Sequence, residues 1–147
     1  MIATAPIHPH PNVKPLRILV ADDSELILES IRQVLTREGH TVTTVTGGSK
    51  ALKLLKGESF DLVIADINMP DGDGFELVGE IRTKYQATRI LVISGGSVHF
   101  TPAYYIDIAR KLGAHASLLK PFNRESLLEG MAAAMGDRGE ATSKRPA

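Results

Sequence analysis

The stretch FDLVIADINMPDGDG, residues 60–74, decides how this chain folds. Its first six residues form a short, mostly branched apolar run, which is typical of a strand buried on both faces. Asp66 follows that run directly, and a polar loop then leads into a helix predicted from Gly74 to about Tyr85. Asp73 and Glu76 have the spacing of a capping box at the start of this helix. A buried strand that passes through a loop into a helix is the repeating unit of an α/β fold.

The same alternation continues on both sides of this stretch. Each apolar run is followed by a segment with helical periodicity, and glycines such as Gly39 and Gly113 stand where helices are expected to end. Regular alternation of this kind predicts an α/β fold in which helices cover both faces of a parallel sheet. The other expected strands are 16–21, 41–46, 89–93 and 115–119, and the other expected helices are 24–38, 49–56, 101–112 and 123–135.

Polar residues stand at the carboxyl ends of four of these strands. Asp22 and Asp23 follow the first, Asp66 the third, Ser94 the fourth and Lys120 the fifth. Ligands of open parallel sheets bind at this edge, so these side chains converge if the four strands are neighbours. Clustered carboxylates repel one another, and a hard divalent cation such as Mg²⁺ relieves that repulsion. A carboxylate can also accept a phosphoryl group as a nucleophile, with a metal and a lysine balancing the charge.

The composition narrows the class of protein. The chain has 147 residues, 17 basic and 17 acidic side chains and no cysteine. This balance argues against a general nucleic-acid binder, and no apolar run reaches the length of a membrane span. Residues 1–14 are expected to be a flexible leader, 15–135 the folded domain and 136–147 a flexible tail. The expectation is a soluble, cytoplasmic protein without a nucleic-acid or membrane partner.

Four motifs resemble the receiver domains of two-component response regulators. They are ILVADDS at 18–24, VIADINMPDGDG at 63–74, LVISGG at 91–96 and ASLLKPF at 116–122. The resemblance covers about 16–135 and implies a CheY-like, flavodoxin-like doubly wound sheet with strand order 2-1-3-4-5.

The resemblance also implies roles for individual residues. Asp66 is the implied phosphoacceptor. The implied ligands of Mg²⁺ are Asp23, which binds it directly, Asp22, which binds it through water, Asp66 and the backbone carbonyl of Asn68. Ser94 and Lys120 are expected to contact the phosphoryl group. The Lys120–Pro121 peptide bond is expected to be cis.

The sequence departs from the family pattern at Ser117, where receivers usually carry an aromatic residue whose rotamer reports on phosphorylation. Tyr104 or Tyr105 could replace it, although ordinary packing is the alternative for both. The segment 94–101 looks long for this family, which suggests either a mobile loop that covers the site or meets a partner, or a surface insertion. In this family the loss of the phosphoryl group to water depends partly on the residues two places after the aspartate and two after the hydroxyl. These are Asn68 and Gly96 here, and the small glycine suggests rapid loss.

The function expected from these features is that of a stand-alone response regulator. It accepts a phosphoryl group from a histidine kinase or a histidine phosphotransfer protein, with Mg²⁺, and signals by protein contact through about 102–135. It is expected not to be an enzyme beyond phosphorylating itself from small donors and losing the group again. The alternative is a receiver-like adaptor that works without phosphorylation. A haloacid dehalogenase-type phosphatase is disfavoured because Asn68 replaces the acid that such an enzyme needs.

Overall fold

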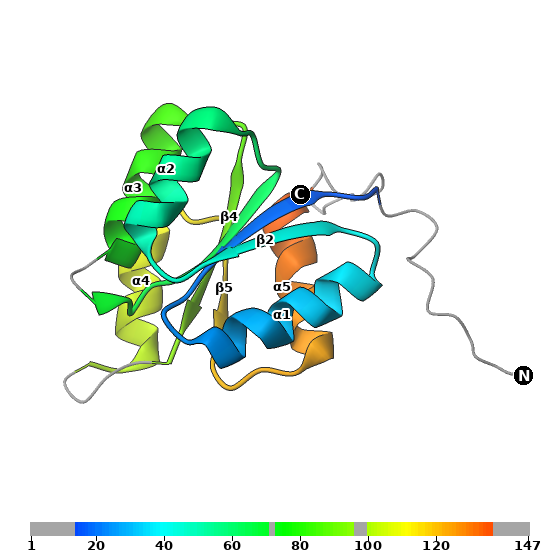
Figure 1. The fold of residues 1–147 in the computed structure, drawn as a ribbon. Helices are drawn as coiled ribbons and strands as arrows, with labels where there is room; N and C mark the ends of the chain where they lie inside the picture. Colours follow the sequence, from blue (N-terminus) through cyan, green and yellow to red (C-terminus); the bar gives the residue numbers. More distant parts are fainter. Residues whose placement is uncertain (1–13, 71–72, 96–99, 137–147) are drawn as a thin grey trace, which may run out of the picture.

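The computed structural model describes residues 14–70, 73–95 and 100–136. Within them, five parallel strands form one sheet in the order β2-β1-β3-β4-β5. Figure 1 shows this sheet between two layers of helices. The predicted fold class and strand order are therefore confirmed. The strands are β1 (Arg17–Ala21), β2 (Thr41–Val45), β3 (Leu62–Asp66), β4 (Arg89–Ser94) and β5 (Ala116–Leu119).

In the described part of the chain, five helices connect and follow the strands, and most of them begin or end at residues suited to that position. Ser24, Thr101 and Asn123 each accept a hydrogen bond from a backbone N–H of the first turn. Gly113 ends the fourth helix with φ of 113°, a conformation that costs glycine little. The helices are α1 (Glu25–Arg37), α2 (Gly48–Gly57), α3 (Asp73–Lys84), α4 (Pro102–Leu112) and α5 (Arg124–Met135).

Two apolar cores lie on opposite faces of the sheet. Alternate residues of each strand point to opposite faces, so Ile18 and Val20 belong to one core and Leu19 and Ala21 to the other. The first core is closed by α1 and α5, and the second by α2, α3 and α4, as the two layers in Figure 1 show. This arrangement leaves the carboxyl edge of the sheet open between the helix layers.

The bounds of several elements differ slightly from those expected. β3 and β4 extend through Asp66 and Ser94, so these two polar residues end their strands instead of following them. α3 begins at Asp73, one residue earlier than expected, and the role of this side chain as an N-cap stays a prediction. Among the described residues, no helix combines the length and the apolar character that crossing a bilayer requires.

Two histidines accept backbone hydrogen bonds at the amino-terminal edge of the sheet, which lies opposite the carboxyl edge. Nδ1 of His40 accepts the backbone N–H of Leu16 at 3.0 Å, and Nδ1 of His115 accepts that of Ile90 at 3.0 Å. His40 is buried, and burial lowers its pKa, although the nearby Glu38 acts in the opposite direction. A protonated Nδ1 cannot accept a hydrogen bond, so this buried contact requires the neutral ring.

The His40 contact predicts a loss of stability in mild acid. Because the pKa is lower in the folded state, the unfolded chain binds the proton first, and stability falls once the pH drops below the ordinary histidine pKa of about 6.5. His40→Asn keeps an acceptor at the position of Nδ1 but cannot be protonated. Chemical denaturation between neutral pH and about pH 5 should show a shallower loss of unfolding free energy for this variant. An unchanged slope would mean that His40 does not govern the acid response.

Candidate functional site

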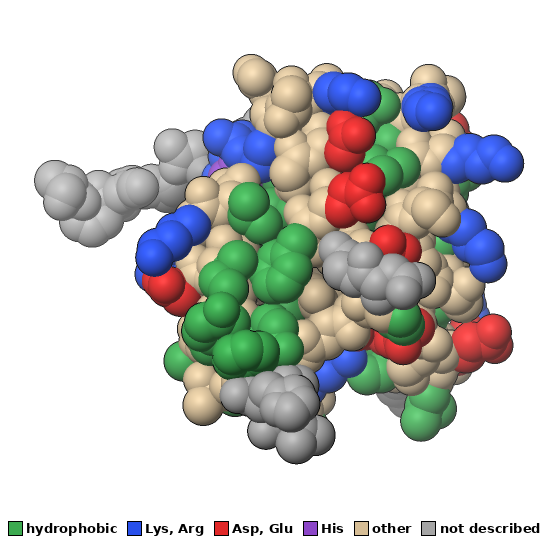
Figure 2. All heavy atoms as spheres, turned by 90° about the vertical axis from the view of Figure 1, so that its left-hand side faces the viewer, with side chains coloured by type: hydrophobic (Ala, Val, Ile, Leu, Met, Phe, Trp, Pro, Cys, Tyr) green, Lys and Arg blue, Asp and Glu red, His purple; other side chains and the backbone are tan. Residues whose placement is uncertain are grey.

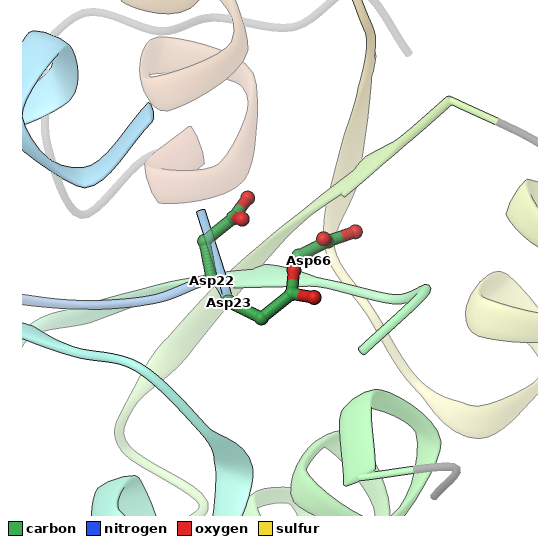
Figure 3. A group of neighbouring side chains, drawn as sticks. All are labelled: Asp22, Asp23 and Asp66. Atoms are coloured by element: carbon green, nitrogen blue, oxygen red, sulfur yellow. The ribbon is translucent and has the colours of Figure 1, made fainter. Parts of the chain in front are cut away.

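The strand ends bring together the polar residues that the sequence singled out. Asp22 and Asp23 follow β1, and Asp66 ends β3, the neighbouring strand. One carboxylate oxygen from each of these three residues lies within 4.8 Å of the others. Figure 3 shows the three side chains gathered at this edge of the sheet. The expected acidic cluster is therefore present in the structure.

Asp22 is the most deeply placed of the three, with none of its surface exposed. Its Oδ1 accepts the backbone N–H of Ser24 at 2.8 Å, which fixes the side chain at the start of α1. Its Oδ2 accepts no hydrogen bond within the described residues, and its 3.2 Å contact with Nζ of Lys120 is an ion pair. Burial raises the pKa of Asp22, and the neighbouring Asp66 carboxylate adds to this, against the lowering effects of Ser24 and Lys120.

Asp66 is 2% exposed and is held through both carboxylate oxygens. Oδ1 accepts the backbone N–H of Asn68 at 3.0 Å, and Oδ2 accepts a hydrogen bond from Nζ of Lys120 at 3.2 Å. Lys120 thus lies between Asp66 and Asp22, at 3.2 Å from each carboxylate. Burial acts to lower the pKa of Lys120, but Asp66 and Asp22 outweigh it and raise the pKa. The ammonium group therefore stays charged.

Ser94 ends β4 beside this cluster and is fully buried. Its backbone carbonyl accepts the N–H of Lys120 at 2.9 Å, which fixes the end of β5 against the end of β4. The Lys120–Pro121 peptide bond is cis, as expected. Two roles stay predictions: the carbonyl of Asn68 as a ligand of Mg²⁺ and the hydroxyl of Ser94 as a contact of the phosphoryl group. Residues 96–99 of the predicted 94–101 loop, which include Gly96, lie outside the described residues.

Gly74 is a site residue that the sequence reading missed. It lies in the first turn of α3, where the backbone approaches Asp66 closely. An added Cβ would come within 2.5 Å of the carbonyl oxygen of Asp66 and 2.6 Å of Cα of Ile67. Both neighbours are backbone atoms that cannot rotate away. The glycine in the GDG sequence at 72–74 was a visible signal, but its proximity to Asp66 depends on how α3 packs.

The donor set fits a divalent cation of the Mg²⁺ type. Three carboxylates face one lysine, so two negative charges are left unbalanced. One buried carboxylate oxygen, Oδ2 of Asp22, has unfilled hydrogen-bonding capacity within the described residues. Carboxylate oxygens together with retained waters are the usual ligands of Mg²⁺ in proteins. Asp22, Asp23 and Asp66 could therefore hold such an ion.

Asp22→Asn is expected to stabilise the metal-free protein at neutral pH. The folded protein raises the pKa of Asp22, so folding favours the protonated carboxyl. This contribution to stability is complete below the unfolded-state pKa and is lost as the pH rises through the folded-state pKa. At neutral pH the charged carboxylate therefore does not stabilise the fold. Asparagine keeps an acceptor for Ser24 and removes the buried charge. Thermal unfolding in EDTA should show that the free energy of unfolding of this variant exceeds that of wild type by on the order of 1 kcal/mol, and that the difference disappears in acid.

The same experiment with Mg²⁺ should reverse the order of the two proteins. Wild type gains stability because the ion binds only the folded state, whereas Asp22→Asn gains little. Asp23→Asn is the matched control, because it removes an equal charge from an exposed position and should stabilise the metal-free protein less. An Asp22→Asn variant that is less stable than wild type in EDTA would contradict the predicted repulsion.

The fold and the site together define an α/β protein with an acidic pocket at the carboxyl edge of its sheet. Comparison with known proteins identifies the family. Residues 18–132 match the response regulator receiver domain, and the chain belongs to this family of two-component signalling proteins. Phosphorylation of an aspartate and binding of Mg²⁺ in an acidic pocket are properties of the family.

Individual relatives agree with this assignment. The chain is 30% identical over 133 residues to the transcriptional regulatory protein GlrR of Escherichia coli K12, a match that covers 90% of this chain and 29% of GlrR. The structure resembles the chemotaxis response regulator CheY4 of Vibrio cholerae, with a TM-score of 0.73 and 32% identity over 82% of this chain and 99% of that one. A response regulator of Burkholderia pseudomallei matches with a TM-score of 0.70 and 30% identity, over 82% of this chain and 67% of that one. The chain thus spans less than a third of GlrR.

The residues that depart from the family pattern occupy clear positions in the structure. Ser117 is exposed on β5 and lines a groove of about 370 Å³ between α4 and α5, together with Ile106 and Arg110. Tyr105 is partly buried and stacks on Phe75 of α3, with 6.2 Å between ring centroids. Tyr104 is exposed. Whether either tyrosine replaces the missing aromatic residue stays an open prediction.

Proposed function

We propose that Asp66 accepts a phosphoryl group and that this modification changes how the domain binds a partner protein. The observation that carries the proposal is the position of Lys120, whose Nζ lies 3.2 Å from both Asp66 and Asp22 at the open edge of the sheet. In support, the structure of the related Burkholderia pseudomallei protein contains a phosphorylated aspartic acid and a calcium ion.

The proposed reaction is a nucleophilic displacement at phosphorus. A carboxylate oxygen of Asp66 forms a bond to the phosphorus atom, and the bond between phosphorus and the donor's leaving group breaks. The Asn68 N–H orients the carboxylate, and the Asp66 backbone is held by its neighbours on β4. Lys120 exchanges its contact with the carboxylate for one with the phosphoryl oxygens, which carry the spread negative charge of the transition state.

Mg²⁺ is the proposed cofactor, with Asp22, Asp23, Asp66 and the carbonyl of Asn68 as its proposed ligands. When bound, the ion balances the negative charge of the carboxylates and of the incoming phosphoryl oxygens. The protein's own contribution is to hold the acidic side chains in place. The Ser24 N–H holds Asp22 in this way, and the 2% exposure of Asp66 limits the access of water to its carboxylate.

The output is proposed to pass through the surface formed by about 102–135. A phosphoryl group adds about −1.5 to −2 charge and strong acceptor oxygens beside Ser94 and Lys120. Charge-assisted hydrogen bonds are worth about 1.5–3 kcal/mol each, and shifting a two-state element from 1:99 to 99:1 takes about 5.5 kcal/mol. Two such bonds approach this figure. β5 and the start of α5 flank Lys120, so a small shift there reaches the proposed output surface.

The proposed phosphodonor is a histidine kinase or a histidine phosphotransfer protein. A groove of about 420 Å³ beside Lys120 supports such docking, because it combines apolar walls with a direct approach to the lysine. Leu26, on the first turn of α1, is 80% exposed and adds apolar surface near the site. The groove is lined by Ile27, Ser30, Gly95, Lys120, Pro121 and Phe122.

The proposal is tested by incubating the protein with Mg²⁺ and acetyl phosphate and measuring its intact mass. We expect a gain of one phosphoryl group that requires the metal and disappears when EDTA is added first. Absence of any adduct would favour the alternative, a receiver-like adaptor that binds its partner without phosphorylation. An adduct that forms equally well in EDTA would contradict the proposed metal site.

A further inference from the structure

Two glycines set the position of the first turn of α3. Gly74, the second residue of this helix, lies against the end of β3. Gly48, the first residue of α2, is buried and lies against Asp73, the first residue of α3. A Cβ added at Gly48 would come within 2.8 Å of Cβ of Asp73 and within 2.9 Å of its carbonyl oxygen. Atoms do not pack so closely, so only glycine leaves room for α3 at position 48.

The two helices belong to one packed layer. Ala51 and Leu55 of α2 are buried in the same core as Leu77 of α3. Figure 1 shows α2 and α3 side by side on this face of the sheet. Figure 2 faces this side of the molecule and shows hydrophobic side chains gathered together, with acidic and basic side chains beside them. Protein cores are close-packed, so α2 cannot move away from α3 without losing its buried contacts.

The start of α2 is also tied to the acidic cluster. The backbone N–H of Asp22 donates to the carbonyl of Val45, the last residue of β2, at 3.2 Å. Only Thr46 and Gly47 separate Val45 from Gly48. Backbone contacts therefore run from Asp22 through the start of α2 to the first turn of α3, and from there to the end of β3. They join the acidic end of β1 to the acceptor end of β3 by a second route, in addition to the direct pairing of these strands.

We infer that Gly48 is a positioning residue for Asp66, an inference that rests on the proposed phosphorylation of that aspartate. Carbon atoms in contact lie about 3.5–4.0 Å apart, so a methyl group at position 48 would displace Asp73 by at least about 0.7 Å. Gly74 must move with Asp73, because the two are consecutive residues of one helical turn. Since Gly74 lies directly against the backbone of Asp66, the displacement changes the position of the acceptor relative to Asp22.

Gly48→Ala should slow phosphorylation at saturating Mg²⁺ and acetyl phosphate by at least about fivefold, because a displacement of about 1 Å can slow a reaction on the order of 100-fold. Gly47→Ala is the matched control: a Cβ there meets no atom within 4 Å, so this variant should react like wild type. Ala51→Gly is a second control, because it weakens α2 without pushing on α3. Measured well below its melting temperature, it should keep the wild-type rate.

The amide NMR signal of Asn68 reports on the same geometry without any reaction. This N–H donates to Oδ1 of Asp66, so a displaced acceptor changes its chemical shift. Measured in EDTA and without a phosphodonor, the signal should move in Gly48→Ala and keep its wild-type position in Gly47→Ala and Ala51→Gly. Loss of stability alone would not separate Gly48→Ala from Ala51→Gly in this way.

The outcomes separate this inference from the proposed function. Gly48→Ala with the wild-type rate or an unmoved Asn68 signal would overturn the inference, as would an Ala51→Gly variant that is slowed equally. Wild type that takes up no phosphoryl group would refute the proposed function instead, and the Asn68 signal would still decide the role of Gly48. If Gly48→Ala does not fold, Gly79→Ala is added to every variant, because alanine there stabilises α3 and meets no atom within 4 Å.

Discussion

Asp66→Asn is expected to abolish uptake of a phosphoryl group from acetyl phosphate. The amide of asparagine lacks the nucleophilic carboxylate oxygen that forms the acyl phosphate. It is nevertheless close in shape to aspartate, and its oxygen can still accept the N–H of Asn68 that Oδ1 accepts in wild type. The variant should therefore keep the fold while losing the reaction. Intact mass after incubation with Mg²⁺ and donor measures the loss.

Asp107→Asn is the matched control for this experiment. It makes the same chemical change on the exposed side of α4, and this variant should take up the phosphoryl group as wild type does. Thermal unfolding of Asp66→Asn in EDTA should show no loss of stability, because the substitution removes a negative charge next to Asp22. Phosphoryl uptake by Asp66→Asn at the wild-type level would mean that the acceptor is another residue.

Gly74→Ala is expected to impair the site although residue 74 itself carries no functional group. The added methyl group would lie 2.5 Å from the Asp66 carbonyl oxygen and within 2.7 Å of the backbone of Ile67. Either α3 or the end of β3 must move, and overpacking of this kind costs about 1–3 kcal/mol. A displacement of Asp66 by even about 1 Å can slow a reaction on the order of 100-fold. We therefore expect a rate of phosphorylation lower by at least about tenfold.

Gly79→Ala makes the same substitution on the same helix without the clash. An added Cβ there meets no atom within 4 Å, so alanine should stabilise α3 by up to about 1 kcal/mol through its higher helix propensity. Its phosphorylation rate should equal that of wild type. Equal rates for Gly74→Ala and wild type would show that the close approach of α3 to Asp66 does not position the acceptor.

The fold and the acidic cluster could be predicted because both follow from local pattern. Apolar runs such as 60–65 identify buried strands, and parallel strands place their carboxyl ends at one edge. Asp22 and Asp66 stand at such ends, so their proximity needs only the strand order that the family resemblance supplied. The helix starts at Thr101 and Asn123 were predictable for the same reason, since a cap depends on residues three positions away.

Features that depend on packing between distant segments could not be predicted. The approach of Gly74 to Asp66 depends on the path of the chain between β3 and α3. The contact of His40 with Leu16 joins residues 24 positions apart through the pairing of β1 and β2. Ile27 and Leu28 are neighbouring apolar residues of α1, yet only Leu28 is buried. Side-chain burial of this kind depends on the orientation of the helix on the sheet.

The chemical location of the phosphoryl group tests the proposed role of Asp66 most directly. Borohydride reduces an acyl phosphate, which converts the modified aspartate to homoserine, and peptide mass mapping then identifies the residue. We expect homoserine at position 66 only after incubation with both Mg²⁺ and acetyl phosphate, and unmodified aspartate at 22 and 23. Homoserine at another position, or a phosphorylated protein in which residue 66 stays aspartate, would contradict the proposal.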